Sequence, residues 1–236
     1  MADPARRAIA LVDLTSLTGE EDDAALDALC AKALTPAGPV AAVCVYGAKV
    51  ARVRSQLAPG TIRVAAVTNF PEGDNDPERA RTESAAAVEA GADEIDVVLP
   101  WRAWLDGEHA AALMVIEAAR SEAPVLKVIL ETGALGDPAV IAAASRAALQ
   151  AGADFVKTST GKRSPGATTE AALPMLEAIR DHGAGGFKVS GGVRTTLQAA
   201  EYLAIADGLL GPTWATPETF RIGASTLLDD LLESLA

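Results

Sequence analysis

Three of the six lysines in the chain stand inside short apolar runs, VLKVI, FVKTS and FKVSG. These residues, Lys127, Lys157 and Lys188, are 30 and 31 positions apart, the length of one strand–helix unit. A lysine in such a run must pair its charge or lose its proton, because an unpaired buried ammonium group is costly. The chain otherwise prefers arginine, which occurs 14 times and cannot lose its proton, whereas lysine can. A neutral lysine amine attacks carbonyl carbon, so the pattern predicts Schiff-base chemistry, with Lys157 as a candidate nucleophile.

Lys157 and Lys188 are expected on neighbouring parallel strands, which lie about 4.8 Å apart. Two ammonium groups about 6 Å apart repel by about 3 kcal/mol at an effective dielectric of 20, equivalent to about two pKa units. Burial lowers the pKa of a lysine in the same direction. Electrostatics does not decide which of the two lysines attacks. The alternative interpretation is that the lysines form structural ion pairs with Asp96 or another interior carboxylate.

Asp96 is the strongest acid–base candidate among the carboxylates. The segments AGADEIDVV (90–98) and AGADFVKTS (151–159) align at an offset of 61 residues, which places Asp96 at the position of Lys157. An aspartate inside the apolar run IDVVLP either pairs with a lysine or handles protons. Asp13 in LVDLTSL is a weaker candidate that could instead cap or bond a loop. Cys44 in VCVY has the context of a packed core thiol.

Short apolar runs alternate with alanine-rich helical patterns along the chain. Strands are expected at 8–14, 40–46, 63–69, 94–100, 125–131, 154–159, 186–190 and 220–225. Helices are expected at 21–34, 48–57, 77–90, 108–121, 137–150, 169–181, 195–204 and 226–235. Eight strand–helix units predict an α/β fold, a closed (β/α)8 TIM barrel over a single domain, 1–236. A doubly wound open sheet is the alternative, but no GxGxxG or GxxxxGK[ST] motif follows any strand.

The loops after the seventh and eighth strands are the usual phosphate site of such barrels. Here they read SGGVRTT (190–196) and GAST (223–226), and each precedes a predicted helix. Glycines permit close backbone approach to an anion, and a helix N-terminus attracts it. The candidate phosphate contacts are Gly191, Gly192, Arg194, Gly223 and Ser225, with Gly161 and Lys162 as a further contact. The alternatives are an ordinary Gly-Gly turn and a solvated loop lysine.

Composition excludes several other classes of function. The net charge of −12 and the absence of a basic run argue against nucleic acid as a partner. No uncharged apolar stretch is long enough to span a membrane, and AIALV is too short for a signal peptide, so a cytoplasmic protein is expected. Cys30 and Cys44 lack a CxxC spacing, and His109 and His182 stand in polar contexts. We therefore expect no disulfide framework, no metal site and no histidine triad.

Seven segments in unbroken order resemble the deoxyribose-phosphate aldolase family. They are LVDLTSL, VTNFPEG, GADEIDVVLP, LKVILETG, GADFVKTSTGK, FKVSGGVRT and FRIGAS, and the resemblance runs from about residue 9 to 228. It implies a (β/α)8 barrel and a metal-independent class I aldolase whose only covalent group is a lysine imine. The implied reaction is reversible cleavage of 2-deoxy-D-ribose 5-phosphate to acetaldehyde and D-glyceraldehyde 3-phosphate. The implied partners are a phosphorylated sugar and small aldehydes, and members of the family are often homodimers.

The resemblance also assigns roles to individual residues. The lysine of the VKTSTG motif forms the Schiff base, here Lys157, and the lysine before the glycine pair perturbs its pKa, here Lys188. The aspartate of the DEIDVV motif, here Asp96, relays protons. The same segments supply further candidate substrate contacts, namely Asp13, Thr15, Cys44, Lys127 and Thr158.

The chain departs from the family pattern at two places. Val189 and Ser190 precede the glycine pair, where smaller or proline-containing variants are expected. Some members carry a C-terminal tail that ends in a tyrosine at the active site, whereas this sequence ends in LLESLA and Tyr46 and Tyr202 do not match that position. Two other functions stay open, a class I aldolase of the same fold acting on another sugar phosphate and a non-catalytic sugar-phosphate-binding barrel.

Overall fold

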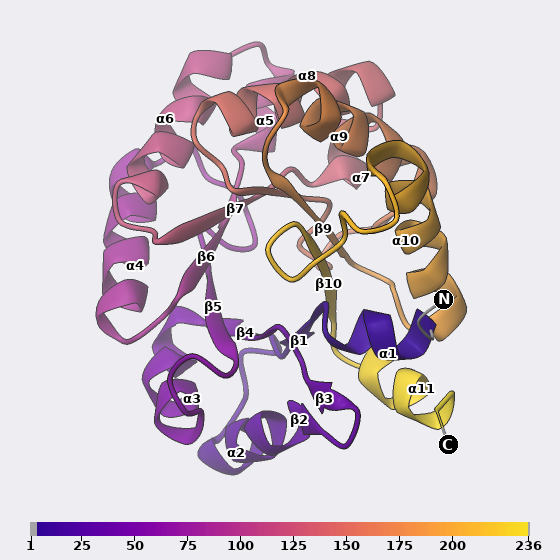
Figure 1. Ribbon diagram of the computed structural model, residues 1–236. Helices are drawn as coiled ribbons and strands as arrows, with labels where there is room; N and C mark the ends of the chain where they lie inside the picture. The colour runs from indigo at the N-terminus through magenta and orange to yellow at the C-terminus, as the bar shows by residue number, and fades with distance from the viewer. Residues whose placement is uncertain (1–3, 236) are drawn as a thin grey trace.

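A closed barrel of eight parallel strands forms the centre of the computed structural model, which describes residues 4–235. The strands follow one another around the barrel in the order β1, β10, β9, β8, β7, β6, β5, β4 (Figure 1). They are β1 (Val12–Thr15), β4 (Ala42–Tyr46), β5 (Arg63–Thr68), β6 (Glu94–Val98), β7 (Val125–Ile129), β8 (Phe155–Lys157), β9 (Gly186–Ser190) and β10 (Phe220–Ala224). The predicted (β/α)8 fold is therefore confirmed.

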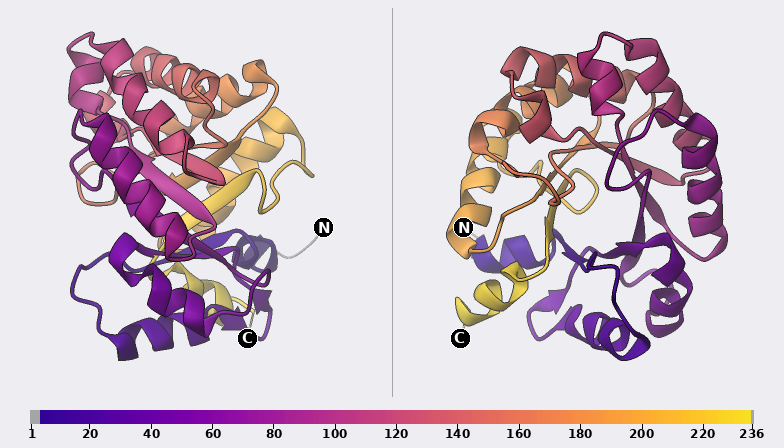
Figure 2. Two further views of the ribbon diagram at one scale, coloured as in Figure 1. Left: turned by 90° about the vertical axis from the view of Figure 1, so that its left-hand side faces the viewer. Right: turned by 180° about the vertical axis from the view of Figure 1, so that it is seen from behind.

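Helices surround the barrel and cover the outer face of the strands, as two further views show (Figure 2). They are α2 (Asp23–Lys32), α3 (Val50–Gln56), α4 (Pro77–Glu89), α6 (His109–Arg120), α8 (Pro138–Gln150), α9 (Thr169–His182), α10 (Thr196–Leu210) and α11 (Leu227–Glu233). Two of them begin at an Asp–Pro pair. Asp76 and Asp137 accept hydrogen bonds from first-turn N–H groups, each directly before a proline.

Register between neighbouring strands aligns the charged interior residues. Lys157 on β8 lies beside Lys188 on β9, and Lys188 lies beside Arg221 on β10. Asp96 on β6 lies beside Lys127 on β7. Alternate residues of a strand face the same side, so a buried charge on one strand meets charges of its neighbours inside the barrel.

Several elements differ from the prediction. Residues 4–9 form helix α1 (Pro4–Ile9), so the first expected strand, 8–14, begins too early. Ala5, Ala8 and Ile9 are buried, and the helix packs against α10 and α11, which explains its apolar residues without a strand. Helix α10 continues to Leu210, beyond its expected end at 204, because AIADGLL contains no proline or helix-ending cap.

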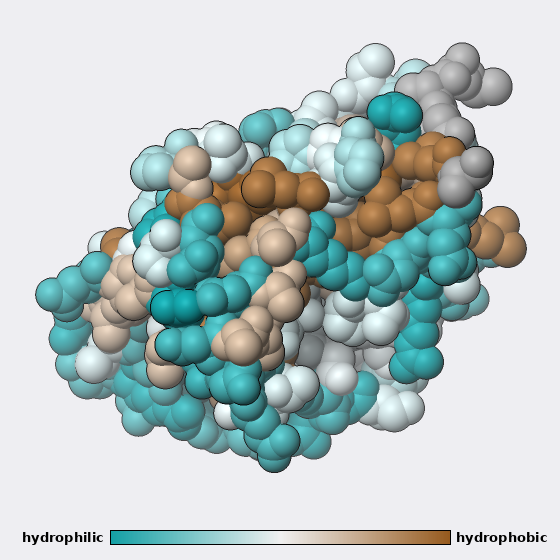
Figure 3. Space-filling view, turned by 90° about the horizontal axis from the view of Figure 1, so that it is seen from below, coloured by the Kyte–Doolittle hydropathy of each residue, from teal (hydrophilic) through white to brown (hydrophobic). Residues whose placement is uncertain are grey.

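Short elements in the loops were also not predicted. They are the β2–β3 hairpin (Leu34–Thr35 and Gly38–Pro39), the 3₁₀ turn η1 (Gly47–Lys49), α5 (Trp101–Leu105) and α7 (Thr132–Leu135). The face of the molecule seen from below in Figure 1, where α2, the hairpin and α11 lie, carries a band of apolar side chains (Figure 3). Leu34 in the hairpin is 60% exposed. Across residues 4–235, no helix has the length and apolar character needed to cross a membrane.

Candidate active site

Seven charged side chains fill part of the barrel interior. Lys157 is 3% exposed, and the other six are at most 1% exposed. They come from six strands and comprise Asp13, Glu94, Asp96, Lys127, Lys157, Lys188 and Arg221. A buried charge is tolerated only when it is paired and hydrogen-bonded, so the contacts among these groups decide their protonation.

Six of the seven form a closed ring in which positive and negative groups alternate. On one side of the ring, Asp13 binds Arg221 at 2.7 Å and Lys188 at 2.5 Å, and Lys188 binds Asp96 at 2.8 Å. On the other side, Lys127 contacts Asp96 at 2.8 Å and Glu94 at 2.5 Å. A 2.7 Å bond between Glu94 and Arg221 closes the ring. The ring contains three carboxylates and three cations and is electrically balanced.

Lys157 is the seventh group and stands outside this ring. Its Nζ donates to Asp96 Oδ2 at 2.7 Å, the same oxygen that Lys188 contacts. Burial lowers the pKa of Lys157, the attraction of Asp96 opposes that effect, and the charge on Lys188 lowers the pKa further. The net shift is downward from the ordinary value of 10.5, in the direction that the sequence predicts. Of the two effects that lower the pKa of Lys157, burial is the larger and the charge on Lys188 is the smaller.

The remaining groups are held in their charged forms. Burial alone would lower the pKa of Lys188, but Asp13 and Asp96 outweigh it and raise the pKa. The pKa of Lys127 is raised in the same way by Asp96 and Glu94. Burial opposes ionisation of Asp96, yet Lys127, Lys157 and Lys188 together bring its pKa well below the usual range. The cluster therefore contains one lysine whose pKa is lowered beside two that stay protonated.

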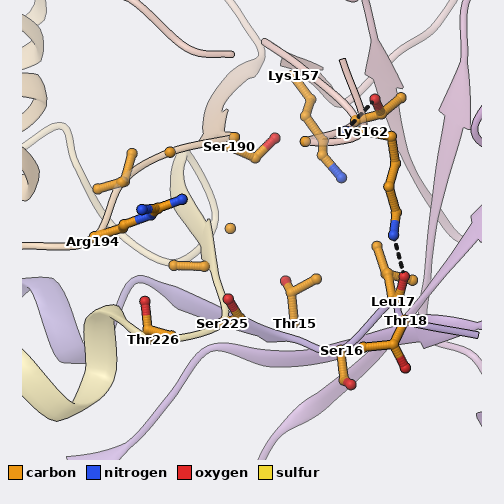
Figure 4. Close-up of a pocket in the computed structure, with 17 residues that line it drawn as sticks. Thr15, Ser16, Leu17, Thr18, Lys157, Lys162, Ser190, Arg194, Ser225 and Thr226 are labelled. Carbon is orange, nitrogen blue, oxygen red and sulfur yellow. Dashed lines mark hydrogen bonds between the residues drawn. The ribbon is translucent and has the colours of Figure 1, made fainter. Parts of the chain in front are cut away.

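A cavity of about 310 Å³ opens over Lys157 at the carboxyl ends of β1, β8, β9 and β10 (Figure 4). Its walls are the loops that follow these four strands, 15–18, 160–162, 190–194 and 223–226. The Lys157 amine points into this space, with Arg194 on the opposite side. Lys162 runs along one wall and donates from Nζ to the carbonyl oxygen of Leu17 at 2.5 Å. The site lies at the end of the barrel where active sites of this fold occur.

The end of the cavity away from Lys157 has the backbone geometry of an anion site. Gly191 and Gly192 have φ of +94° and +108°, a conformation that favours glycine. Next to them, α10 begins with a capping box between Thr195 and Gln198. Within residues 4–235, the backbone N–H groups of Gly192 and Ser225 have no hydrogen-bond acceptor. An anion placed here would gain donors that are otherwise unused.

The predicted site residues fall into two layers. Nine line the cavity: Thr15, Lys157, Gly161, Lys162, Gly191, Gly192, Arg194, Gly223 and Ser225. Six lie outside its walls: Asp13, Cys44, Asp96, Lys127, Thr158 and Lys188. Asp13 is in the middle of β1 as a member of the ring, whereas the sequence suggested a loop bond at the end of the strand. Cys44 is a buried free thiol whose pKa is raised by burial, which agrees with the packed-core interpretation.

Thr158 and Lys127 have local partners that explain their positions. Thr158 Oγ1 donates to the carbonyl oxygen of Ser190 at 2.9 Å, which joins the ends of β8 and β9. Lys127 is fully enclosed between Glu94 and Asp96, which is the geometry of a structural ion pair. Direct contact of these two side chains with substrate stays a prediction.

Sequence reasoning missed Arg221, Glu94 and part of the cavity wall. Signals for the first two were present, because Arg221 interrupts the apolar run FRIGA and Glu94 stands two residues before Asp96, on the same face of the strand. The missed wall residues are Ser16, Leu17, Thr18, Thr160, Ser190, Val193, Ala224 and Thr226. Within the described residues, no group of three or more His, Cys, Asp or Glu side chains is arranged to hold a metal ion.

Comparison with known proteins agrees with this architecture. The model of the DeoC/LacD family aldolases matches residues 7–232. A structure from Toxoplasma gondii, provisionally identified as a deoxyribose-phosphate aldolase, is 27% identical with a TM-score of 0.87 and covers 98% of this chain and 93% of its own. One from Coccidioides immitis, with the same provisional identification, is 28% identical with a TM-score of 0.86 over 100% and 88% of the two chains.

A third structure has the same fold. The tetrameric deoxyribose phosphate aldolase from Aeropyrum pernix is 25% identical, with a TM-score of 0.80 over 100% of this chain and 93% of that one. The family match covers nearly the whole barrel, including every strand that contributes to the charged cluster. From its sequence and its fold, the chain belongs to the DeoC/LacD family of aldolases.

Proposed function

We propose that this aldolase cleaves 2-deoxy-D-ribose 5-phosphate to acetaldehyde and D-glyceraldehyde 3-phosphate through a Schiff base on Lys157. The observation that carries the proposal is the position of Lys157, whose amine has a lowered pKa and points into a cavity with an anion site at its other end. The provisional and established names of the similar structures support the choice of substrate.

The reaction begins with attack of the neutral Lys157 amine on the C1 aldehyde of the open-chain sugar. The carbinolamine loses water to give the imine, and removal of the C3 hydroxyl proton then breaks the C2–C3 bond. Glyceraldehyde 3-phosphate leaves, and the electron pair remains on the enzyme as an enamine between C1 and C2. Protonation at C2 followed by hydrolysis releases acetaldehyde and restores the amine.

Asp96 and Lys188 handle the protons of these steps. Asp96 contacts both Nζ atoms at 2.7 and 2.8 Å, so it bridges the reacting amine and a protonated lysine. The carboxylate stabilises the positive charge of the iminium ion, and Lys188 returns protons through it. The reaction draws on no group beyond these side chains and water.

The phosphate occupies the far end of the cavity in this proposal. Gly191, Gly192 and Ser225 surround it with backbone and hydroxyl donors, and Arg194 supplies a positive charge. A cavity of about 310 Å³ suits a five-carbon sugar phosphate, because binding sites for small molecules begin at about this size. Local donors are required because the net charge of the chain, −12, repels an anion at long range.

Borohydride reduction in the presence of acetaldehyde and a panel of ketose phosphates tests the proposal. Intact mass and peptide mapping should find an ethyl group on Lys157, while Lys157→Arg should lose both the adduct and the cleavage of deoxyribose phosphate. Lys49→Arg, a lysine outside the cluster, is the matched control and should keep both.

Two other results would replace the proposal. A larger ketose adduct on Lys157, with no acetaldehyde adduct, would indicate an aldolase for a different sugar phosphate. No adduct with any carbonyl compound, but retained binding of sugar phosphates, would indicate a non-catalytic barrel.

A further inference from the structure

Arg221 and Glu94 form a buried ion pair that the proposed mechanism does not use. Neither lines the cavity, and they are 1% and 0% exposed. Arg221 donates to Glu94 at 2.7 and 3.1 Å and to Asp13 at 2.7 Å. The aromatic side chain of Phe155 lies beside them, and the centre of its phenyl group is 5.5 Å from the Arg221 guanidinium carbon and 6.0 Å from Lys127 Nζ. A buried arginine that touches no substrate acts only through its neighbours.

The two residues add one charge of each sign to four ring members that already carry two charges of each sign. Without the Arg221–Glu94 pair, the remaining four members are Asp13, Lys188, Asp96 and Lys127, whose ends are joined by a longer ion pair of 3.9 Å between Lys127 and Asp13. With the pair, every carboxylate has two cationic ring neighbours and every cation has two carboxylate neighbours. Lys157 then adds a seventh group to a neutral set. Among residues 4–235, the one carboxylate that it contacts is Asp96, which is already shared with two lysines.

We propose that Arg221 and Glu94 are positioning residues that act on Lys157 in opposite directions: Arg221 helps to keep Lys157 a free amine by balancing Asp13 and Glu94, and Glu94 in turn balances Arg221 and Lys127. Loss of Arg221 leaves three carboxylates and two cations, so Lys157 takes up a proton to restore the balance. Loss of the Glu94 charge leaves an excess of positive charge, so Lys157 releases its proton more readily. The proposal deepens the proposed function and rests on it only in taking Lys157 as the reacting amine.

Among residues 4–235, the groups that act directly on the charge of Lys157 are Asp96, Lys188 and Cys44, and two further cations, Lys162 and Arg194, line the same cavity. Asp96 reaches it from β6 and Lys188 lies beside it on β9, whereas Lys127 contacts Asp96 and Glu94 contacts Lys127. Cys44 on β4 is a neutral thiol with a raised pKa, and Asp13 and Arg221 complete the set from β1 and β10. A shift in the titration of Lys157 on removal of Arg221 therefore reports on the ring.

The test is a pH titration of protein labelled with ¹³C at lysine Cε, which has six resonances because the chain has six lysines. The resonance of Lys157 is assigned by its loss in Lys157→Arg. Arg221→Met should raise the Lys157 midpoint by about one unit, the effect of a unit charge lost about 10 Å away at an effective dielectric of 20. Glu94→Gln should lower the midpoint. The double variant removes one charge of each sign and should return close to the wild-type value.

Arg63→Met is the matched control. Arg63 also approaches Glu94, at 3.5 Å, but its side chain is 45% exposed and its charge is screened by water. Its loss should leave the Lys157 midpoint within a few tenths of a unit. If Arg221→Met does not fold, the nearly isosteric Glu94→Gln carries the test against the wild type, and Arg221→Lys should keep a midpoint close to the wild-type one.

Three results would overturn the proposal. The first is a titration midpoint of Lys157 in the wild type that equals the ordinary value for lysine. The second is a shift of the same sign in Arg221→Met and Glu94→Gln. The third is a shift in Arg63→Met as large as that in Arg221→Met. The titration needs no substrate, so its outcome is separate from that of the proposed function. Absence of a borohydride adduct would refute the proposed Schiff base but would not affect the proposal for Arg221 and Glu94. Adducts on Lys157 without opposite shifts in the two single variants would support the Schiff base and refute the proposal for Arg221 and Glu94.

Discussion

Lys157 and Lys188 are the same residue type, in register on adjacent strands, and both contact the same oxygen of Asp96. Their pKa values nevertheless move in opposite directions, downward for Lys157 and upward for Lys188. The difference is the second carboxylate, Asp13, which lies 2.5 Å from Lys188 and makes no contact with Lys157. A single additional partner therefore separates a lysine whose pKa is lowered from one that is protonated in the resting site.

Removal of the charge on Lys188 tests this division of roles. Lys188→Met deletes a neighbouring positive charge and leaves more of Asp96 to Lys157, and both effects raise the pKa of Lys157. The acidic limb of the pH profile of kcat/KM should move to higher pH by about two units. The same substitution at Lys49, which donates to the carbonyl oxygen of Glu21, should leave the profile in place. An unmoved limb in Lys188→Met would mean that burial alone sets the pKa.

The anion end of the cavity gives a second prediction for a single residue. Ser225→Asp places a negative charge among the proposed phosphate donors, so KM for deoxyribose 5-phosphate should rise at least tenfold. Unphosphorylated deoxyribose should react about as before, since it has no charge to repel. Ser225→Asn changes size and polarity without charge and serves as the control. Equal losses for both sugars in Ser225→Asp would assign the phosphate to another place.

Strand β10 passes so close to β9 that a side chain at Gly223 does not fit. A Cβ atom there would be 2.9 Å from Ser190 Cβ and 3.1 Å from Lys188 Cε. Gly223 therefore has a structural reason to be glycine in addition to its place in the cavity wall. The space it leaves is the space through which Lys188 reaches Asp13 and Asp96.

Gly223→Ala should push Lys188 away from its carboxylate partners. We expect a loss of about 1–3 kcal/mol in the free energy of unfolding, measured with urea, together with a lower kcat. Gly208→Ala is the control on α10, where no atom lies within 4 Å of the added Cβ, and it should stabilise the protein by up to about 1 kcal/mol. Unchanged stability and kcat in Gly223→Ala would show that Lys188 can move away from the added methyl group without losing its carboxylate partners.

The elements that could be predicted from sequence are those with a repeated local signal. Lysines one strand–helix unit apart, and the 61-residue offset that aligns Asp96 with Lys157, indicate which residues share the barrel interior. The structure confirms that side chains at these positions meet, with Asp96 between Lys127, Lys157 and Lys188.

The choice of partner could not be predicted in the same way. Whether Arg221 meets Glu94 or Asp96 depends on the tilt and stagger of the strands, which are properties of the closed barrel and not of any segment. The cavity residues Ser16 and Thr18 were missed for a related reason, because the loop after β1 reaches the site only when β1 lies beside β10. Helix α1 was missed because its apolar residues continue directly into those of β1.

For the molecule as a whole, the charged cluster predicts sensitivity to acid. The pKa values of Asp13, Glu94 and Asp96 are all lowered in the folded state. Their contribution to stability is therefore complete above the ordinary values of 3.8 and 4.5, and it is lost as pH falls below them toward the folded-state values.

The urea midpoint should begin to fall below about pH 4.5 and should keep falling through pH 3, where these carboxyl groups are protonated in the unfolded chain but not in the folded ring. Asp229→Asn, which removes a surface partner of Lys32 with 59% of the side chain exposed, should leave the slope unchanged. Asp96→Asn should flatten it, because one of the three linked carboxylates is gone. A wild-type midpoint that does not vary between pH 4.5 and pH 3 would show that the pKa values of these carboxyl groups are not lowered in the folded state.

The closed ring also constrains how this barrel can change over evolutionary time. A single substitution in the ring leaves a buried charge without its partner, which typically costs 3–5 kcal/mol, a large part of the stability of a domain. Only coordinated replacements of an acid and a base together keep the interior neutral, and such pairs arise rarely. The loops at 15–18, 190–194 and 223–226 carry no such restriction, apart from glycines such as Gly191 and Gly223. New substrates in this lineage are therefore expected to be acquired through the loops, while the interior retains an inherited arrangement of charge.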